Sequence, residues 1–132
     1  MDYYKKITTP EATTETNPLV SQFKVTKGYI RGGFLYFPPG SAGLLHVSLS
    51  LGLHQILPAN QGEYVRADNR VLPIDFFQLI DQPPLEITIT TWNESTTYEH
   101  SVDICLFLHT KDYEEELKKK PGFFRKLFMR EE

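Results

Sequence analysis

Hydrophobic and polar residues alternate along three stretches of the chain, residues 45–53, 85–91 and 102–108. In the first stretch, the odd-numbered positions are Leu or Val and the even-numbered positions are His, Ser or Gly. Successive side chains of a strand point to opposite faces, whereas the same leucines in a helix would lie all round its axis. The pattern therefore predicts three strands, each with one buried face.

Several shorter stretches are rich in β-branched and aromatic residues, which favour strands. Between them lie clusters of Pro, Gly, Asn and Asp, which are typical of turns. The pair Gly32–Gly33 predicts a β-bulge or a close approach of two backbones. The expected short strands cover residues 20–25, 29–37, 55–58, 63–66 and 70–73, while 75–79 is either a strand or a single helical turn.

Residues 19–110 are thus predicted to form one all-β domain. A sheet with one apolar face needs a second layer to cover it, and no helix is expected here to do so. We expect an antiparallel β-sandwich, with a small barrel as the alternative. The middle strands are short and irregular and the flanking ones are long, which favours a jelly-roll-like sandwich.

The N-terminal segment, residues 1–18, is rich in Thr, Glu and Pro. No strand or helix pattern marks it, so we expect an extended arm without a core of its own. It is either a frayed terminus or an arm that a neighbouring subunit orders, and in the second case Tyr3 and Tyr4 would be its anchors.

Residues 111–132 differ from the domain, since they carry half of all Lys and Arg in the chain. Glu114–Glu116 precede Lys118–Lys120 by four positions, which supports a helix. After Pro121–Gly122, an apolar face spanning about 140° of a second short helix would need cover from the sandwich, another chain or a membrane surface. The predicted partner-contact residues of this helical tail are Phe123, Phe124, Leu127 and Phe128.

Composition narrows the possible functions. The chain has 132 residues and a net charge of -3, which suits one domain and argues against a general nucleic-acid binder, since such proteins neutralise phosphates with basic residues. No run of 18 apolar residues and no signal peptide is present, so we expect a soluble protein made in a cytoplasm and without a transmembrane segment.

The residues that carry enzymatic chemistry are not arranged for it. The single cysteine, Cys105, lies mid-strand among apolar neighbours, which indicates a packed residue and excludes an internal disulfide. Neither a nucleophile elbow nor a phosphate-binding glycine loop occurs. His46 and His54 would lie about 26 Å apart on one strand, too far to share a metal. We therefore predict no catalytic residue, no cofactor and no metal site.

A binding face is the stronger prediction. Trp92, Asn93 and Tyr98 surround one polar loop, and aromatic rings with amides on a β-sandwich are typical of carbohydrate-binding modules. The alternative is that Trp92 caps the end of the core.

One resemblance points to a different role. The runs FPPGSAGL at 37–44 and QILP at 55–58, with Trp92–Asn93, His100 and Val102, resemble small β proteins encoded near the structural genes of tailed viruses. The resemblance covers residues 28–108. It implies a non-enzymatic virion component, which is a capsid-decorating, vertex or neck protein. Such a protein would form a trimer or higher ring and contact the major capsid protein. The Phe-rich tail departs from it.

Overall fold

The computed structural model describes residues 2–110, and within this range the chain consists of strands, turns and loops without a helix. The all-β prediction is confirmed for this part. Its strands are β1 (Asp2–Thr9), β2 (Leu19–Lys24), β3 (Gly28–Phe37), β4 (Leu45–Leu51), β5 (His54–Leu57), β6 (Arg70–Ile74), β7 (Gln78–Ile80), β8 (Glu86–Asn93) and β9 (His100–His109).

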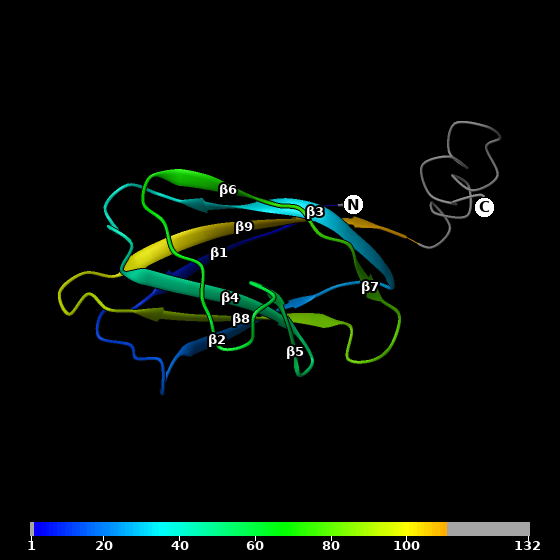
Figure 1. Ribbon diagram of the computed structural model, residues 1–132, viewed down its shortest axis with the longest axis horizontal. Coiled ribbons are helices and arrows are strands. Elements are labelled where there is room, and N and C mark those ends of the chain that lie inside the picture. Colours follow the sequence, from blue (N-terminus) through cyan, green and yellow to red (C-terminus); the bar gives the residue numbers. More distant parts are fainter. Residues whose placement is uncertain (1, 111–132) are drawn as a thin grey trace.

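The strands form two sheets that lie one above the other (Figure 1). Sheet 1 has the order β1-β9-β3-β6, with β7 pairing the first part of β3, and sheet 2 has the order β2-β8-β4-β5. Every pairing is antiparallel. The prediction of an antiparallel β-sandwich is therefore confirmed.

The pairings are nested along the sequence. The first strand pairs with the last, β2 with β8, β3 with both β6 and β7, and β4 with β5. Consecutive strands β1 and β2 lie in different sheets, as do β3 and β4. The chain thus crosses between the layers repeatedly, and the start of β1 lies beside the end of β9 (Figure 1).

The core fills the space between the sheets. The inward row predicted for 45–53 is confirmed through Leu49, because Leu45, Val47 and Leu49 are fully buried. The expectation of a single buried face is wrong here, since His46 and Ser48 on the other face are buried as well. A fully buried aliphatic or aromatic side chain stabilises the fold by about 1.5–3 kcal/mol. Opposite this inward row, sheet 1 contributes Ile30, Leu35, Phe37, Val102, Ile104, Leu106 and Leu108.

The predicted irregularity at Gly32–Gly33 is confirmed. The register of β3 against β9 shifts between Ile30 and Gly33, and a Cβ on Gly33 would collide with the carbonyl oxygen of Cys105. Gly33 also has a φ of +152°, which side chains rarely adopt. Only glycine lets β3 and β9 approach this closely.

The prediction of an N-terminal arm is wrong for residues 2–9. These residues form β1, an edge strand that pairs with β9 along its whole length. Ile7 and Thr9 are buried, and alternate residues face solvent. The segment lacks a core of its own, but β9 offers it backbone hydrogen bonds and sheet 2 covers its inner face. The sandwich therefore starts at β1, before the predicted boundary at residue 19.

Smaller differences concern the middle of the chain. Leu53 does not continue the buried row but is fully exposed at the tip of the β4–β5 hairpin. The predicted strand 63–66 is reduced to a single bridge between Val65 and Val47. The ambiguous stretch 75–79 contributes the short strand β7. The predicted helical tail, residues 111–132, lies outside the described residues.

Candidate functional site

The outer face of sheet 1 carries aromatic side chains where a solvated sheet face usually carries polar ones. The register places Tyr4, Cys105, Phe34 and Pro73 in one row across β1, β9, β3 and β6. Their inward neighbours along the strands, such as Leu35 and Ile104, are fully buried, so this row faces outward. The next positions of the same face are Tyr36, Val71 and Phe107, and we call these seven residues the aromatic face.

Two observations show that the aromatic face is closely packed. The rings of Phe34 and Phe107 meet edge to face with centroids 6.3 Å apart. Cys105 lies between Tyr4 and Phe34 and is only 9% exposed although it points outward. Burial raises the pKa of this thiol, with a smaller effect from the Asp2 carboxylate. Tyr4 remains 63% exposed and its hydroxyl donates a hydrogen bond of 2.8 Å to Asp103.

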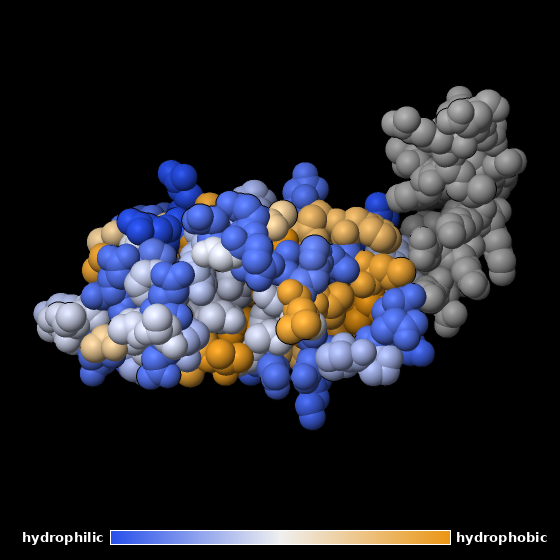
Figure 2. Space-filling view, turned by 60° about the horizontal axis from the view of Figure 1, so that its bottom comes forward, coloured by the Kyte–Doolittle hydropathy of each residue, from blue (hydrophilic) through white to orange (hydrophobic). Residues whose placement is uncertain are grey.

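Hydrophobic residues also gather at one end of the sandwich, seen on the right of Figure 2. There Tyr29 stacks on Phe77 and on His109, with ring centroids 5.0 and 5.6 Å apart. Burial lowers the pKa of His109, with smaller effects from nearby charges. Phe77 is 60% exposed. This end continues the aromatic face along β3 and β9.

A second candidate site, which we call the Trp92 pocket, lies on the outer face of sheet 2. The register pairs His46 of β4 with Trp92 of β8, and their rings stack 3.7 Å apart and nearly parallel. Tyr64 stands almost perpendicular to both rings, at 5.9 Å from Trp92 and 6.1 Å from His46. The adjoining hollow has a volume of about 320 Å³, and its lining comprises Glu15, His46, Gly62, Glu63, Tyr64, Arg66 and Trp92.

Gln55 positions one wall of this pocket. Its buried side-chain amide donates to the carbonyl oxygens of Pro58, Asn60 and Glu63, at 2.8 to 3.1 Å, and its oxygen accepts from the Gly62 amide. The loop then runs antiparallel beside β4, where the backbone of Val65 bonds to that of Val47 in both directions. This pairing places Tyr64 and Arg66 on the outer face, where the Tyr64 ring packs against His46.

The charges around the pocket are mostly acidic. His46 Nε2 donates a hydrogen bond of 2.7 Å to the Glu94 carboxylate, and Arg66 lies 3.8 Å from the same oxygen. Glu15 and Glu63 add two more carboxylates at the rim. Burial, and secondarily Glu15, raise the pKa of Tyr64, so its hydroxyl remains a donor at neutral pH. The pocket thus combines aromatic rings with hydrogen-bond acceptors and one guanidinium.

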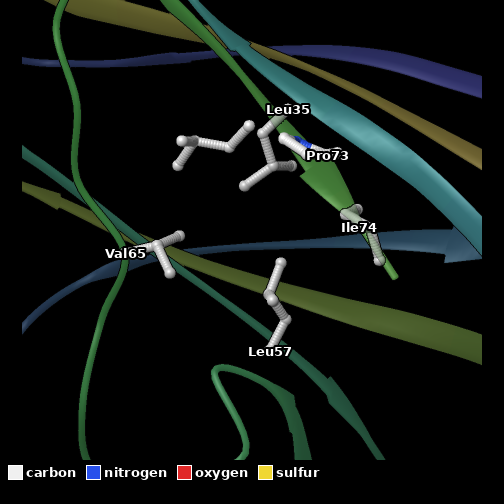
Figure 3. Close-up of a pocket in the computed structure, with 6 residues that line it drawn as sticks. Leu35, Leu57, Val65, Pro73 and Ile74 are labelled. Atoms are coloured by element: carbon white, nitrogen blue, oxygen red, sulfur yellow. The ribbon is translucent and has the colours of Figure 1, made fainter. Parts of the chain in front are cut away.

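An apolar cleft opens between the sheets at the edge formed by β5 and β6 (Figure 3). Its volume is about 170 Å³. The side chains of Leu57 and Val65 approach it from the side of sheet 2, and that of Ile74 from β6, while Pro73 lies at its rim (Figure 3). Among residues 2–110 its lining side chains are all apolar, and it is a feature of the open edge of the core.

The predicted carbohydrate site is not assembled as expected. Trp92 is on the outer face of sheet 2, but Asn93 points inward and is fully buried. Its amide donates to the carbonyls of Thr9, Pro10 and Tyr98 and its oxygen accepts from the Ser95 amide, so it is a structural residue. Alternation along β8 separates the two neighbours. Tyr98 lies exposed in the loop after β8.

The other predicted contact residues are placed as follows. Tyr4 lies on the aromatic face, whereas Tyr3 points to the other side of β1 and bonds to Thr26 through its hydroxyl. Phe123, Phe124, Leu127 and Phe128 lie outside the described residues.

Sequence reasoning missed His46, Tyr64, Glu94 and Arg66 as one cluster. A single signal was available, since His46 and Trp92 both occupy outward positions of predicted strands. No sequence pattern predicts the strand order that joins His46 and Trp92, or the loop that adds Tyr64.

Among residues 2–110, no three His, Cys, Asp or Glu side chains are placed to hold a metal ion. The same residues include no helix long and apolar enough to cross a membrane. No family model, curated protein or solved structure matches the chain.

Proposed function

We propose that this protein is a non-enzymatic structural component of a virus particle, built on a jelly-roll sandwich that binds neighbouring subunits. The resemblance of residues 28–108 to small β proteins of tailed viruses suggests this role. In such a role the protein is made in the host cytoplasm and becomes part of the virion as a decorating, vertex or neck subunit.

The strand order supports the jelly-roll assignment. In a jelly roll, one long antiparallel hairpin is rolled into two sheets, so that first and last strands pair and the pairing is nested inward. The pairs β1–β9, β2–β8, β3 with β6 and β7, and β4–β5 follow this scheme. Such a sandwich has its own core and leaves both outer faces available for contacts.

The aromatic face is the observation that carries the proposal. Tyr4, Val71 and Phe107 are 63%, 54% and 37% exposed, although each is a large side chain on one continuous sheet surface. Contiguous apolar surface of this kind marks contact sites with other proteins. Tyr and Phe are also among the residues enriched in such interfaces.

The proposed occupant of the aromatic face is a neighbouring subunit. The first partner is another copy of this chain, in a trimer or higher ring. Lys6 and Asp103 lie opposite each other on the same sheet surface and supply both signs of charge beside the rings. A mixed rim around an apolar centre is typical of specific protein interfaces. The major capsid protein is the second partner that the resemblance suggests, and the residues 123–128 would add a further contact.

Light scattering after size-exclusion chromatography tests the proposal on the full chain. We expect an oligomer for the wild type and a monomer for Phe34→Ser with Phe107→Ser. Val20→Ser is the matched control, because Val20 is 56% exposed on sheet 2, away from the aromatic face.

The thiol of Cys105 provides an independent readout. In the wild type it should react with a thiol reagent more slowly at concentrations where the oligomer forms than after dilution to the monomer. A wild-type protein that is monomeric at high concentration and does not bind capsid particles in co-sedimentation contradicts the proposal.

A further inference from the structure

We propose that the Trp92 pocket binds a neutral saccharide, with the aromatic corner packing on the C–H face of a pyranose ring. This inference is independent of the aromatic face and of the virion role. It differs from the site expected from the sequence, because Asn93 and Tyr98 take no part in it.

The first argument is the preorganised shape of the pocket. Three rings from β4, β8 and the loop 58–66 are held by mutual stacking and by the hydrogen bond from His46 to Glu94. The volume of about 320 Å³ lies at the lower end of the range for small-molecule pockets. A site whose side chains are already fixed loses little conformational entropy when a ligand binds.

The second argument is the chemistry of the rim. The hydroxyls of a sugar donate hydrogen bonds, and the carboxylates of Glu15 and Glu63 accept them as charge-assisted bonds. The Arg66 guanidinium and the Tyr64 hydroxyl supply donors to sugar oxygens. Aromatic rings bury the apolar face of the same ligand. This combination of acceptors, donors and rings matches a polyhydroxylated ring better than a purely apolar ligand.

The third argument concerns charge. Glu15, Glu63 and Glu94 surround the hollow, while Arg66 is the one Lys or Arg side chain in its described lining. Like charges repel, so an anionic sugar or a phosphate is disfavoured relative to a neutral ligand. A quaternary ammonium ion is the competing ligand class, since aromatic rings and carboxylates also attract cations.

The indole of Trp92 is buried at its nitrogen. Within residues 2–110 its Nε1 has no hydrogen-bond partner, and an unpaired buried donor costs about 1–3 kcal/mol. The ring stacks on His46 and adds aromatic area beside the hollow for contact with a sugar.

A printed array of neutral oligosaccharides, each beside its sialylated counterpart, tests the proposal with the full chain. We expect at least one neutral oligosaccharide to bind, more tightly than its sialylated form, and calorimetry then gives its Kd. Trp92→Ala should weaken this binding at least about tenfold, and Val20→Ser, on the same sheet, should leave it unchanged.

A second variant guards against misfolding of Trp92→Ala. Glu15→Gln with Glu63→Gln changes only exposed side chains, so the fold should persist. This double variant should bind the neutral oligosaccharide more weakly and should prefer it less strongly over the sialylated form. The proposal is overturned if no neutral oligosaccharide binds at millimolar concentration, if choline binds in their place, or if neither variant changes the affinity.

Discussion

Thr9 of β1 and Thr91 of β8 join the two sheets through a hydrogen bond of 2.8 Å between their hydroxyls. Both residues are completely buried, so neither hydroxyl can turn to solvent instead. They lie 82 positions apart in the sequence, and β1 and β8 belong to different sheets. The pair is thus a buried polar link between the two sheets, next to the buried Asn93, whose amide donates to the Thr9 carbonyl.

Removing one member of this link should cost more than removing both. Thr9→Val leaves the Thr91 hydroxyl buried without this partner, and we expect the free energy of unfolding to fall by about 1–3 kcal/mol. Thr9→Val with Thr91→Val should recover much of that loss, because no unpaired hydroxyl remains. Urea denaturation of the two single variants and the double variant gives the coupling energy. Strictly additive effects would contradict this account.

Asn93 should be essential for the β8–β9 loop and the adjoining end of β1. Asn93→Ala removes a buried amide that bonds to three carbonyl oxygens and one amide. We expect a loss of about 2–4 kcal/mol in the free energy of unfolding, at the upper end for single substitutions. Asn60→Ala, at an exposed turn, is the control and should stay within about 0.5 kcal/mol. Equal effects of the two substitutions would refute a structural role for Asn93.

Gly33 should not tolerate a side chain. In Gly33→Ala the new Cβ meets the Cys105 carbonyl, so β3 and β9 must separate or the chain fails to fold. Gly52→Ala also places a side chain at a positive φ, +60°, in the left-handed region that other residues can adopt at a modest cost, and with open space around the Cβ. We expect a loss of about 1 kcal/mol for Gly52→Ala and a loss several times larger for Gly33→Ala. Thermal melts followed by circular dichroism compare the two, and similar melting temperatures would contradict the close approach.

Asp68 should make stability depend on acidic pH. Hydrogen bonds from the backbone amides of Ala42 and Gly40 lower the pKa of Asp68 below its ordinary value of 3.8. A lowered pKa in the folded state means that the stabilisation is complete above 3.8 and is lost as the pH falls through the folded value. Asp68→Asn should therefore be less stable than the wild type at neutral pH.

The stability difference between Asp68→Asn and the wild type should shrink as the pH falls below 3.8. Urea midpoints at pH about 7 and about 2.5 measure this change. A difference that stays constant across this interval would show that the carboxylate charge is not what the two amides stabilise.

Local sequence patterns were sufficient to predict most strands. The period of two at Leu45, Val47 and Leu49 predicts β4 correctly because each inward side chain meets the core. The same pattern fails at Leu53, since the hairpin turn at Gly52 ends the strand first. The strand β1 at the start of the chain was missed because its apolar pattern is too weak, whereas at Leu53 the pattern extended beyond the strand. The single buried aliphatic residue of β1, Ile7, is too weak a signal without β9 beside it.

The candidate sites could be predicted only in part. Trp92 was selected from its residue type, but the other residues that line the pocket are 26 to 77 positions away in the sequence, from Arg66 to Glu15. Asn93 was assigned to the binding face because it adjoins the same polar loop as Trp92 and Tyr98, whereas strand alternation turns its side chain inward. The aromatic face could not be predicted because it needs the order of four strands.

The alternation of apolar and polar residues, with glycine and proline between them, determined by itself that this chain forms short strands with one buried side. Those signals are local, since they depend on side-chain direction and backbone freedom within a few residues. The tertiary structure decided which strands are neighbours, and hence that Tyr4, Cys105 and Phe34 share a surface and that Trp92 meets His46. Such pairings depend on hydrogen bonds and packing between distant segments. These interactions stabilise the chain only once the sheets have formed.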